Sequence, residues 1–133
     1  MKEVFVKNKK ELWDWLKINH KQKESVWLVH FKFASGKTDL TRDDLVDYLL
    51  CFGWIDSLPG KVDELRTKIR ISPRNPKSSW SRINLEKVKR LIKENEMQKS
   101  GLDVIAIAKA NGSFYKITPT QKEMMRNMNR SLK

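Results

Sequence analysis

Residues 51–84, CFGWIDSLPGKVDELRTKIRISPRNPKSSWSRIN, constrain the fold more than any other part of the sequence. Gly53 is typical of a helix end, and residues 56–60 have the Asp, Ser, Pro and Gly content of a chain reversal. We predict one or two short strands over 62–72 and a surface loop over 73–76, where prolines favour extended backbone. A helix end followed by strands indicates mixed helical and sheet structure.

The strand pattern is strongest after residue 66, where apolar and polar side chains alternate with a period of two. An earlier run, 26–33, carries apolar residues on both sides at its start and predicts an interior strand. In the later strand, Thr67, Ile69 and Ile71 form a side that we expect to be buried, and Lys68, Arg70 and Ser72 form a basic side.

Helix start and stop signals divide the rest of the chain. Asn8 and Thr41 are each placed as an N-cap with an acid three residues later. Together with hydrophobic periodicity, such signals predict helices over residues 9–18, 42–52, 82–96 and 102–110. We therefore expect an α+β domain over 1–115, with a small antiparallel sheet of about three strands covered by four to five helices. A basic helical tail is expected over 116–133.

The net charge of +12 is concentrated in two regions. Residues 68–93 carry nine basic side chains and one acidic, and residues 116–133 carry five basic and one acidic. Such a field attracts phosphates, nucleic acid or anionic lipid, although it can also be only a solvated face. In the third helix the predicted basic patch is Lys89, Arg90 and Lys93, opposite an inner arc of Leu85, Val88, Leu91 and Ile92.

Residue content argues against several classes of site. One cysteine, Cys51, excludes an internal disulfide, and two histidines leave no Cys/His cluster at metal-ligand spacing. We find no P-loop, Gly-x-Ser-x-Gly, HExxH or dinucleotide motif, so we expect no cofactor and favour a non-enzymatic protein. Neither an apolar leader nor a run of about 18 apolar residues is present, which predicts a cytoplasmic protein without a transmembrane segment.

Arginine, serine and tryptophan side chains gather around the predicted loop and suggest an anion site. Arg70 and Arg74 offer planar forks for phosphate or carboxylate, and the amides at the start of the next helix form an anion cradle. Two tryptophans could form the walls of the site or stack on a base. The candidate ligand-binding residues are Trp54, Asp56, Arg70, Arg74, Ser78, Trp80, Ser81, Arg82 and Asn84.

The same residues also have a structural interpretation. Trp80 can be a hydrophobic plug under the loop, and Arg74 can pair internally with Asp56. In that case the loop is a folding device and not a pocket. The three aspartates within residues 43–47 are expected to face water and are interpreted as helix acids that complement the helix dipole, and not as a metal or acid/base cluster.

Several strings resemble a known family. They are LCFGWID at 50–56, the acidic pair Asp63 and Glu64, ISPRNPKSSWSRIN at 71–84 and VKRLIKENEMQKSGL at 88–102. In this order they resemble the bacteriocin-protection family of YdeI/OmpD-associated proteins, over residues from about 11 to 115. The resemblance implies a role in protecting bacteria against bacteriocins and other cationic antimicrobial peptides, and it implies no catalytic residues.

A chain with this net charge repels cationic peptides, so we do not expect it to sequester them directly. We expect instead an anionic ligand, either a phosphorylated small molecule or nucleic acid. One alternative is a protein-interaction module that acts through the Met-bearing helix predicted over 118–132. The remaining alternative is an enzyme of unknown reaction.

Overall fold

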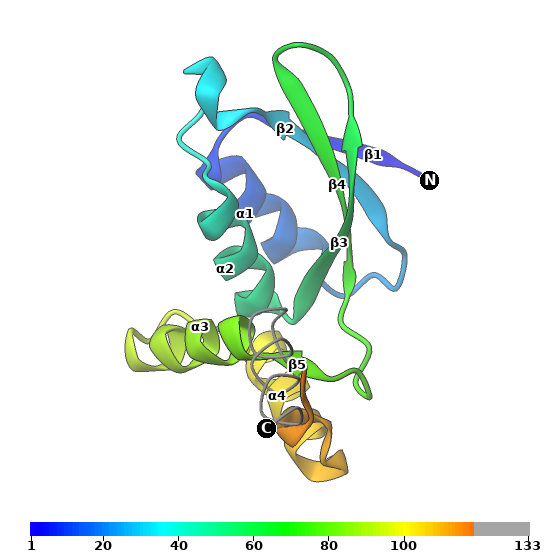
Figure 1. Cartoon of the computed structure of the whole chain (residues 1–133), viewed down its shortest axis with the longest axis vertical. Coiled ribbons are helices and arrows are strands. Elements are labelled where there is room, and N and C mark those ends of the chain that lie inside the picture. The colour runs from blue at the N-terminus through cyan, green and yellow to red at the C-terminus, as the bar shows by residue number, and fades with distance from the viewer. Residues whose placement is uncertain (119–133) are drawn as a thin grey trace, which may run out of the picture.

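The computed structural model describes residues 1–118, in which helices cover one face of a mixed sheet (Figure 1). This architecture confirms the predicted α+β class. The strands are β1 (Glu3–Val6), β2 (Val26–Phe31), β3 (Trp54–Lys61), β4 (Arg66–Pro73), β5 (Trp80–Ser81) and β6 (Ile117–Thr118). The helices are α1 (Lys9–Asn19), α2 (Arg42–Phe52), α3 (Arg82–Lys93) and α4 (Lys99–Asn111), with short 3-10 turns η1 (Phe33–Ser35) and η2 (Ser113–Tyr115).

The helix boundaries that depend on local capping agree closely with the sequence. The side chain of Asn8 accepts a hydrogen bond from the Glu11 amide at 2.9 Å, so α1 begins where its cap was predicted. Thr41 and Asp44 form a reciprocal capping box at the start of α2. Gly53 ends α2 with a left-handed φ of 79°, which a side chain would strain.

The main sheet has four strands in the order β1-β2-β4-β3. β2 is interior, as predicted, and pairs in parallel with β1 and antiparallel with β4. The chain reversal predicted at 56–60 is wrong, because these residues belong to β3, and the turn lies between Lys61 and Arg66. β3 is an edge strand with a register shift between Asp56 and Pro59, and an edge position tolerates proline.

The core lies between the helices and one face of the sheet. Alternate strand residues face α1 and α2 and are almost completely buried, and α2 also contacts α3, α4 and β3. This cluster includes Val6, Leu12, Leu16, Val26, Leu28, Leu45, Leu49, Ile69 and Ile71. Val29 is 4% exposed but lies outside this cluster, because it is on the opposite side of β2.

The second half of the chain departs from the predicted boundaries. α3 ends at Lys93, and Ile92 is half exposed where an inward position was predicted, since only a narrower stripe of α3 is buried. α4 begins at Lys99 and keeps Leu102 partly exposed, so it is amphipathic and not wholly buried. Residues 117–118 pair with β5, and the rest of the predicted tail helix lies outside the described residues.

None of the helices among the described residues has the length and apolar character needed to cross a lipid bilayer.

Candidate functional site

The two tryptophans of the predicted anion site are core residues. Trp54 is 1% exposed and its indole N–H donates to the His20 carbonyl at 3.0 Å. Trp80 is 2% exposed and its ring makes an edge contact with Phe114. Neither ring has a face open to a ligand, so the structural interpretation of Trp80 as a plug describes its environment.

Arg74 is also buried, with 6% of its surface exposed. Its guanidinium lies over the Trp80 ring at 3.6 Å, and its Nη2 donates to the Ser79 carbonyl at 2.9 Å. Burial lowers the pKa of Arg74 to about 10, which leaves it charged at neutral pH. Its Nε and Nη1 atoms are buried and find no hydrogen-bond acceptor in the part of the chain that the structure describes.

The predicted ion pair between Arg74 and Asp56 is wrong. Asp56 accepts a hydrogen bond from Arg42 Nη2 at 2.8 Å, because β3 runs beside the start of α2. The Ser81 hydroxyl caps α3 by accepting from the Asn84 amide, and the Ser78 hydroxyl donates to the Asn75 carbonyl.

The remaining candidates lie in three places. Arg82 is exposed at the start of α3, Asn84 is partly buried one turn along the same helix, and Arg70 lies on β4 away from the loop. The structure thus does not bring the predicted site residues together into one pocket.

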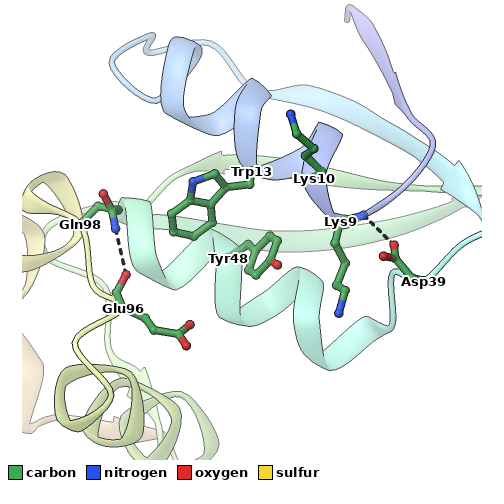
Figure 2. A pocket seen from close by; sticks show the side chains of 7 residues that line it. All are labelled: Lys9, Lys10, Trp13, Asp39, Tyr48, Glu96 and Gln98. Atoms are coloured by element: carbon green, nitrogen blue, oxygen red, sulfur yellow. Dashed lines mark hydrogen bonds between the residues drawn. The ribbon is translucent and has the colours of Figure 1, made fainter.

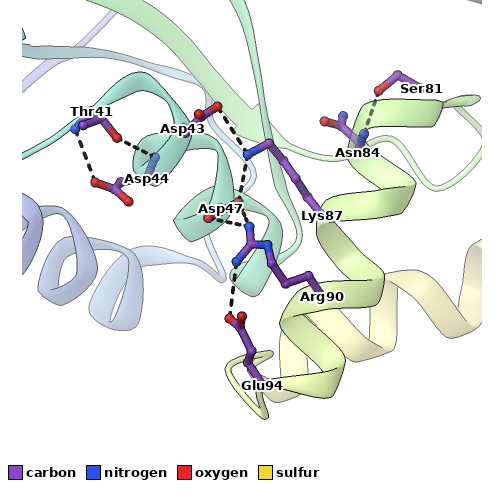
Figure 3. A network of polar contacts seen from close by, with 9 residues as sticks. All are labelled: Thr41, Asp43, Asp44, Asp47, Ser81, Asn84, Lys87, Arg90 and Glu94. Carbon is purple, nitrogen blue, oxygen red and sulfur yellow. Dashed lines mark hydrogen bonds and ion pairs between the residues drawn. The ribbon is translucent and has the colours of Figure 1, made fainter.

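The basic face of α3 is tied to the acids of α2 (Figure 3). Asp47 accepts from Arg90 Nη2 at 2.8 and 2.7 Å and from Lys87 Nζ at 3.1 Å. Asp43 lies 3.4 Å from the same lysine. The aspartates were predicted to face water, but Asp47 is turned towards α3, and its side chain is only 15% exposed.

Of the predicted basic patch, Lys89 and Lys93 are exposed on α3. They line a shallow depression with Arg90, Glu86 and Glu94. Arg90 is bound to Asp47, and the carboxylates of Glu86 and Glu94 offset part of the remaining charge. The patch therefore has less uncompensated positive charge than the sequence indicates.

The opposite face of the main sheet combines aromatic and basic side chains. We call it the open face, because among residues 1–118 all four helices lie elsewhere, as Figure 1 shows. β2 and β4 pair residue by residue, so the outward side chains of one strand lie beside those of the other. The open face includes Glu3, Phe5, Trp27, Val29, Phe31, Arg66, Lys68 and Arg70.

Cations lie directly over rings on the open face. Lys68 Nζ is 4.7 Å from the centre of the Trp27 ring, and the Arg66 guanidinium is 5.6 Å from the centre of the Phe5 ring. Phe5 meets Phe31 edge to face at 5.4 Å. These stems and rings cover Val29, which explains how a residue outside the main core is buried.

Two of the three cations on the open face have an acidic side chain beside them. Arg66 is held by Asp63 through its Nε at 2.9 Å and its Nη2 at 2.7 Å. Lys68 has only a loose contact of 3.4 Å with Glu3, whose side chain is half exposed. Arg70 lies opposite Trp27 in the register, and its buried Nε has no hydrogen-bond partner among the described residues.

A separate depression of about 540 Å³ lies beside α1 and α2 (Figure 2). Trp13 and Tyr48 form its aromatic floor and meet edge to face at 5.1 Å. Lys9, Lys10 and Asp39 lie towards one end and Glu96 towards the other. Burial raises the pKa of Tyr48, with nearby Asp44 as a further cause.

Cys51 is completely buried, and burial raises the pKa of its thiol to about 12, so it is protonated at neutral pH. Burial lowers the pKa of His30, whose Nδ1 is 3.0 Å from the Phe31 carbonyl oxygen. Within the described residues, no three His, Cys, Asp or Glu side chains gather where they could hold a metal ion.

Comparison with known families gives one match. A family model described as a domain of unknown function (DUF8412) matches residues 4–104. The chain belongs to this family. Neither the curated proteins nor the solved structures contain a match to it. The DUF8412 match runs from the second residue of β1 to the middle of α4, so it includes the main sheet except Glu3.

Sequence reasoning missed the open face of this DUF8412 protein. It identified the basic side of β4 and the alternation of β2, but it did not place the two strands side by side. It also missed β1, whose alternation of Glu3 and Phe5 with Val4 and Val6 was the available signal. Phe5 reaches the open face only through this strand.

Proposed function

We propose that this protein is a non-enzymatic nucleic-acid-binding module and that the open face of its sheet is the binding surface. The observation that carries the proposal is the placement of Lys68 and Arg70 around Trp27, on a face that no helix of residues 1–118 covers. Rings offer stacking surfaces and cations offer phosphate contacts, and nucleotides have both a flat base and a phosphate. A ligand with charge alone would make no use of the aromatic side chains.

The open face fits this function better than the predicted patch on α3. On α3, Arg90 is held by Asp47 and its neighbours include two glutamates. On the open face, the partly buried Arg70 forms no ion pair with an acid of residues 1–118, and Lys68 shares only a loose contact with an exposed acid. A phosphate can take the place of Glu3 at Lys68 with little loss, because exposed ion pairs contribute about 0–1 kcal/mol.

The test compares two variants that remove the same charge from different surfaces. Lys68→Gln with Arg70→Gln alters the open face, and Lys89→Gln with Lys93→Gln alters α3. Binding of a labelled oligonucleotide is measured by fluorescence anisotropy between 50 and 300 mM salt. Loss of two phosphate contacts lowers the slope of log K against log salt by about 1.4, which is roughly 25-fold in affinity at 0.1 M salt.

We expect that loss for the open-face variant and a change of about 3-fold or less for the α3 variant, whose charges act only at a distance. Equal losses, or a larger loss for the α3 variant, would overturn the assignment to the open face. Failure of the unaltered protein to bind nucleic acid at 50 mM salt would overturn the function itself.

A protective role against bacteriocins, as the YdeI/OmpD-associated resemblance implies, would then be indirect. The cations of the open face repel cationic peptides, so protection would follow from binding an anionic cell component.

A further inference from the structure

We infer that the open face selects single-stranded over double-stranded nucleic acid, with an unpaired base stacked on Trp27 in the place that Lys68 occupies in the free protein. The inference rests on the proposed function and adds the form of the ligand. It is carried by the shape of the Trp27 environment.

The Trp27 ring reaches from β2 past β4 towards β3, and Lys68 Nζ lies over it. It is directly opposite Arg70 in the register, and it extends far enough to lie 3.4 Å from where a Cβ on Gly60 would be. The same Cβ would come within 2.9 Å of the Lys68 side chain. Glycine at this β3 position therefore makes room for the ring and for the lysine that covers it.

Only weak contacts hold Lys68 in its position over the Trp27 ring. Lys68 Nζ lies 4.7 Å from the centre of the ring and 3.4 Å from a Glu3 carboxylate oxygen, and both contacts are of a kind that is weak at partly exposed sites. A base can replace the ammonium over the ring while the flexible lysine turns to a phosphate. Arg70, directly opposite Trp27 in the register and only partly buried, places a second cation beside the same ring.

A second ring lies along the same strand face. Phe31 is four residues from Trp27 on β2, a distance of about 13 Å, and it packs against Phe5, which is 39% exposed. One base cannot reach both rings, so a strand of several nucleotides gains a contact that a mononucleotide lacks. A duplex offers neither, because its bases are stacked on each other and only their edges are accessible.

The experiment uses a twelve-nucleotide oligothymidine, its duplex with oligoadenine, and thymidine monophosphate as probes. We expect the single strand to bind at least 10-fold more tightly than either the duplex or the mononucleotide. Trp27→Leu should weaken single-strand binding about 10-fold or more while leaving the salt slope unchanged, because a stack is lost but no phosphate contact. Tyr115→Leu removes an exposed ring near α4 and is the matched control, with no change expected.

Two measurements keep the test independent of folding defects. Trp27→Phe retains a ring and should weaken binding less than Trp27→Leu. In the unaltered protein, the Trp27 indole N–H resonance should shift on adding oligothymidine. Equal binding of duplex and single strand, or an unshifted Trp27 resonance, would overturn this inference even if Lys68→Gln with Arg70→Gln still lowers affinity. If that double variant also binds normally, the assignment of binding to the open face falls as well, and if the unaltered protein binds no nucleic acid, the proposed function falls.

Discussion

Asp47 holds two cations of α3 against α2, and its removal provides a sharp test of what these charges do. Its side chain is 15% exposed and accepts from Arg90 at 2.8 and 2.7 Å and from Lys87 at 3.1 Å. Asp47→Asn keeps the shape and removes the charge. Hydrogen bonds to charged groups contribute about 1.5–3 kcal/mol, but exposed pairs contribute less than 1, and Arg90 is 43% exposed. We expect Asp47→Asn to lower the free energy of unfolding by about 1–3 kcal/mol.

A double-mutant cycle isolates the contact from other effects of the substitution. Urea unfolding of the unaltered protein, Asp47→Asn, Arg90→Gln and the double variant should give a coupling energy of about 1 kcal/mol at 50 mM salt. The coupling should shrink at 0.5 M salt, since Arg90 is partly exposed to screening ions. Glu94→Gln is the control, because it alters a longer contact of 3.3 Å to the same arginine within α3.

The result also bears on function. If Lys87 and Arg90 were a binding surface masked by Asp47, Asp47→Asn would raise affinity for oligonucleotides. Under the proposed function their release changes affinity little, because the open face lies on the sheet and not on α3. A coupling energy within 0.3 kcal/mol of zero would refute the structural reasoning, and a large gain in nucleic-acid affinity would refute the functional part.

Three further predictions concern single buried positions. A Cβ on Gly101 would collide with the Cys51 carbonyl oxygen and lie 2.8 Å from the Leu50 carbonyl oxygen, so Gly101→Ala should lower the free energy of unfolding in urea by about 1–3 kcal/mol. The control Lys99→Ala changes an exposed residue and should alter it by less than about 0.5 kcal/mol. Equal values for the two variants would contradict the close approach of α4 to α2. Burial raises the pKa of Cys51 from 9.0 to about 12, so the stability that the protonated thiol contributes is complete below pH 9 and is lost as the pH rises to 12. In Cys51→Ala, the free energy of unfolding should therefore fall less steeply between pH 9 and 12. Parallel pH profiles for the two proteins would contradict this prediction. Arg74→Met removes a buried cation at similar volume, so its free energy of unfolding from thermal unfolding should stay within about 1 kcal/mol of that of the unaltered protein. Arg74→Ala leaves a cavity and should lower the free energy of unfolding by about 2 kcal/mol or more. Similar losses in the two variants would show that the charge matters more than the volume.

The features that sequence predicted best are those decided within one turn of helix. Thr41, Asp44 and Gly53 fix both ends of α2 through contacts between neighbours in the chain, and its observed bounds are the predicted ones. The strands were harder, because pairing depends on residues far apart. Pro59 and Gly60 have turn chemistry, yet they lie in an edge strand whose irregular register accommodates them.

The residues of the predicted anion site do not form one pocket, for a related reason. Charge and residue type located Arg74 and Trp80 correctly as unusual, but only the three-dimensional structure shows that they pack on each other and are lost to solvent. Similarly, the partner of Asp56 is Arg42, a residue fourteen positions away on α2. The sequence shows which cationic residues are present, whereas their availability to a ligand depends on which acids the fold places beside them.

The arrangement of Arg74 explains why we place the proposed ligand surface elsewhere. Its backbone N–H donates to the Gly53 carbonyl at 2.9 Å, and its side chain contacts Ser79 and Trp80, so it joins the end of α2 and the end of β4 to the start of α3. Substitution there therefore alters the fold before it alters any surface. On β2 and β4, the alternation of side chains separates core packing from surface contacts, because one side of each strand packs in the core and the other faces outwards. Trp27 and Lys68 can consequently change to suit a ligand while the helix-facing side of the sheet, and the stability it provides, stays as it is.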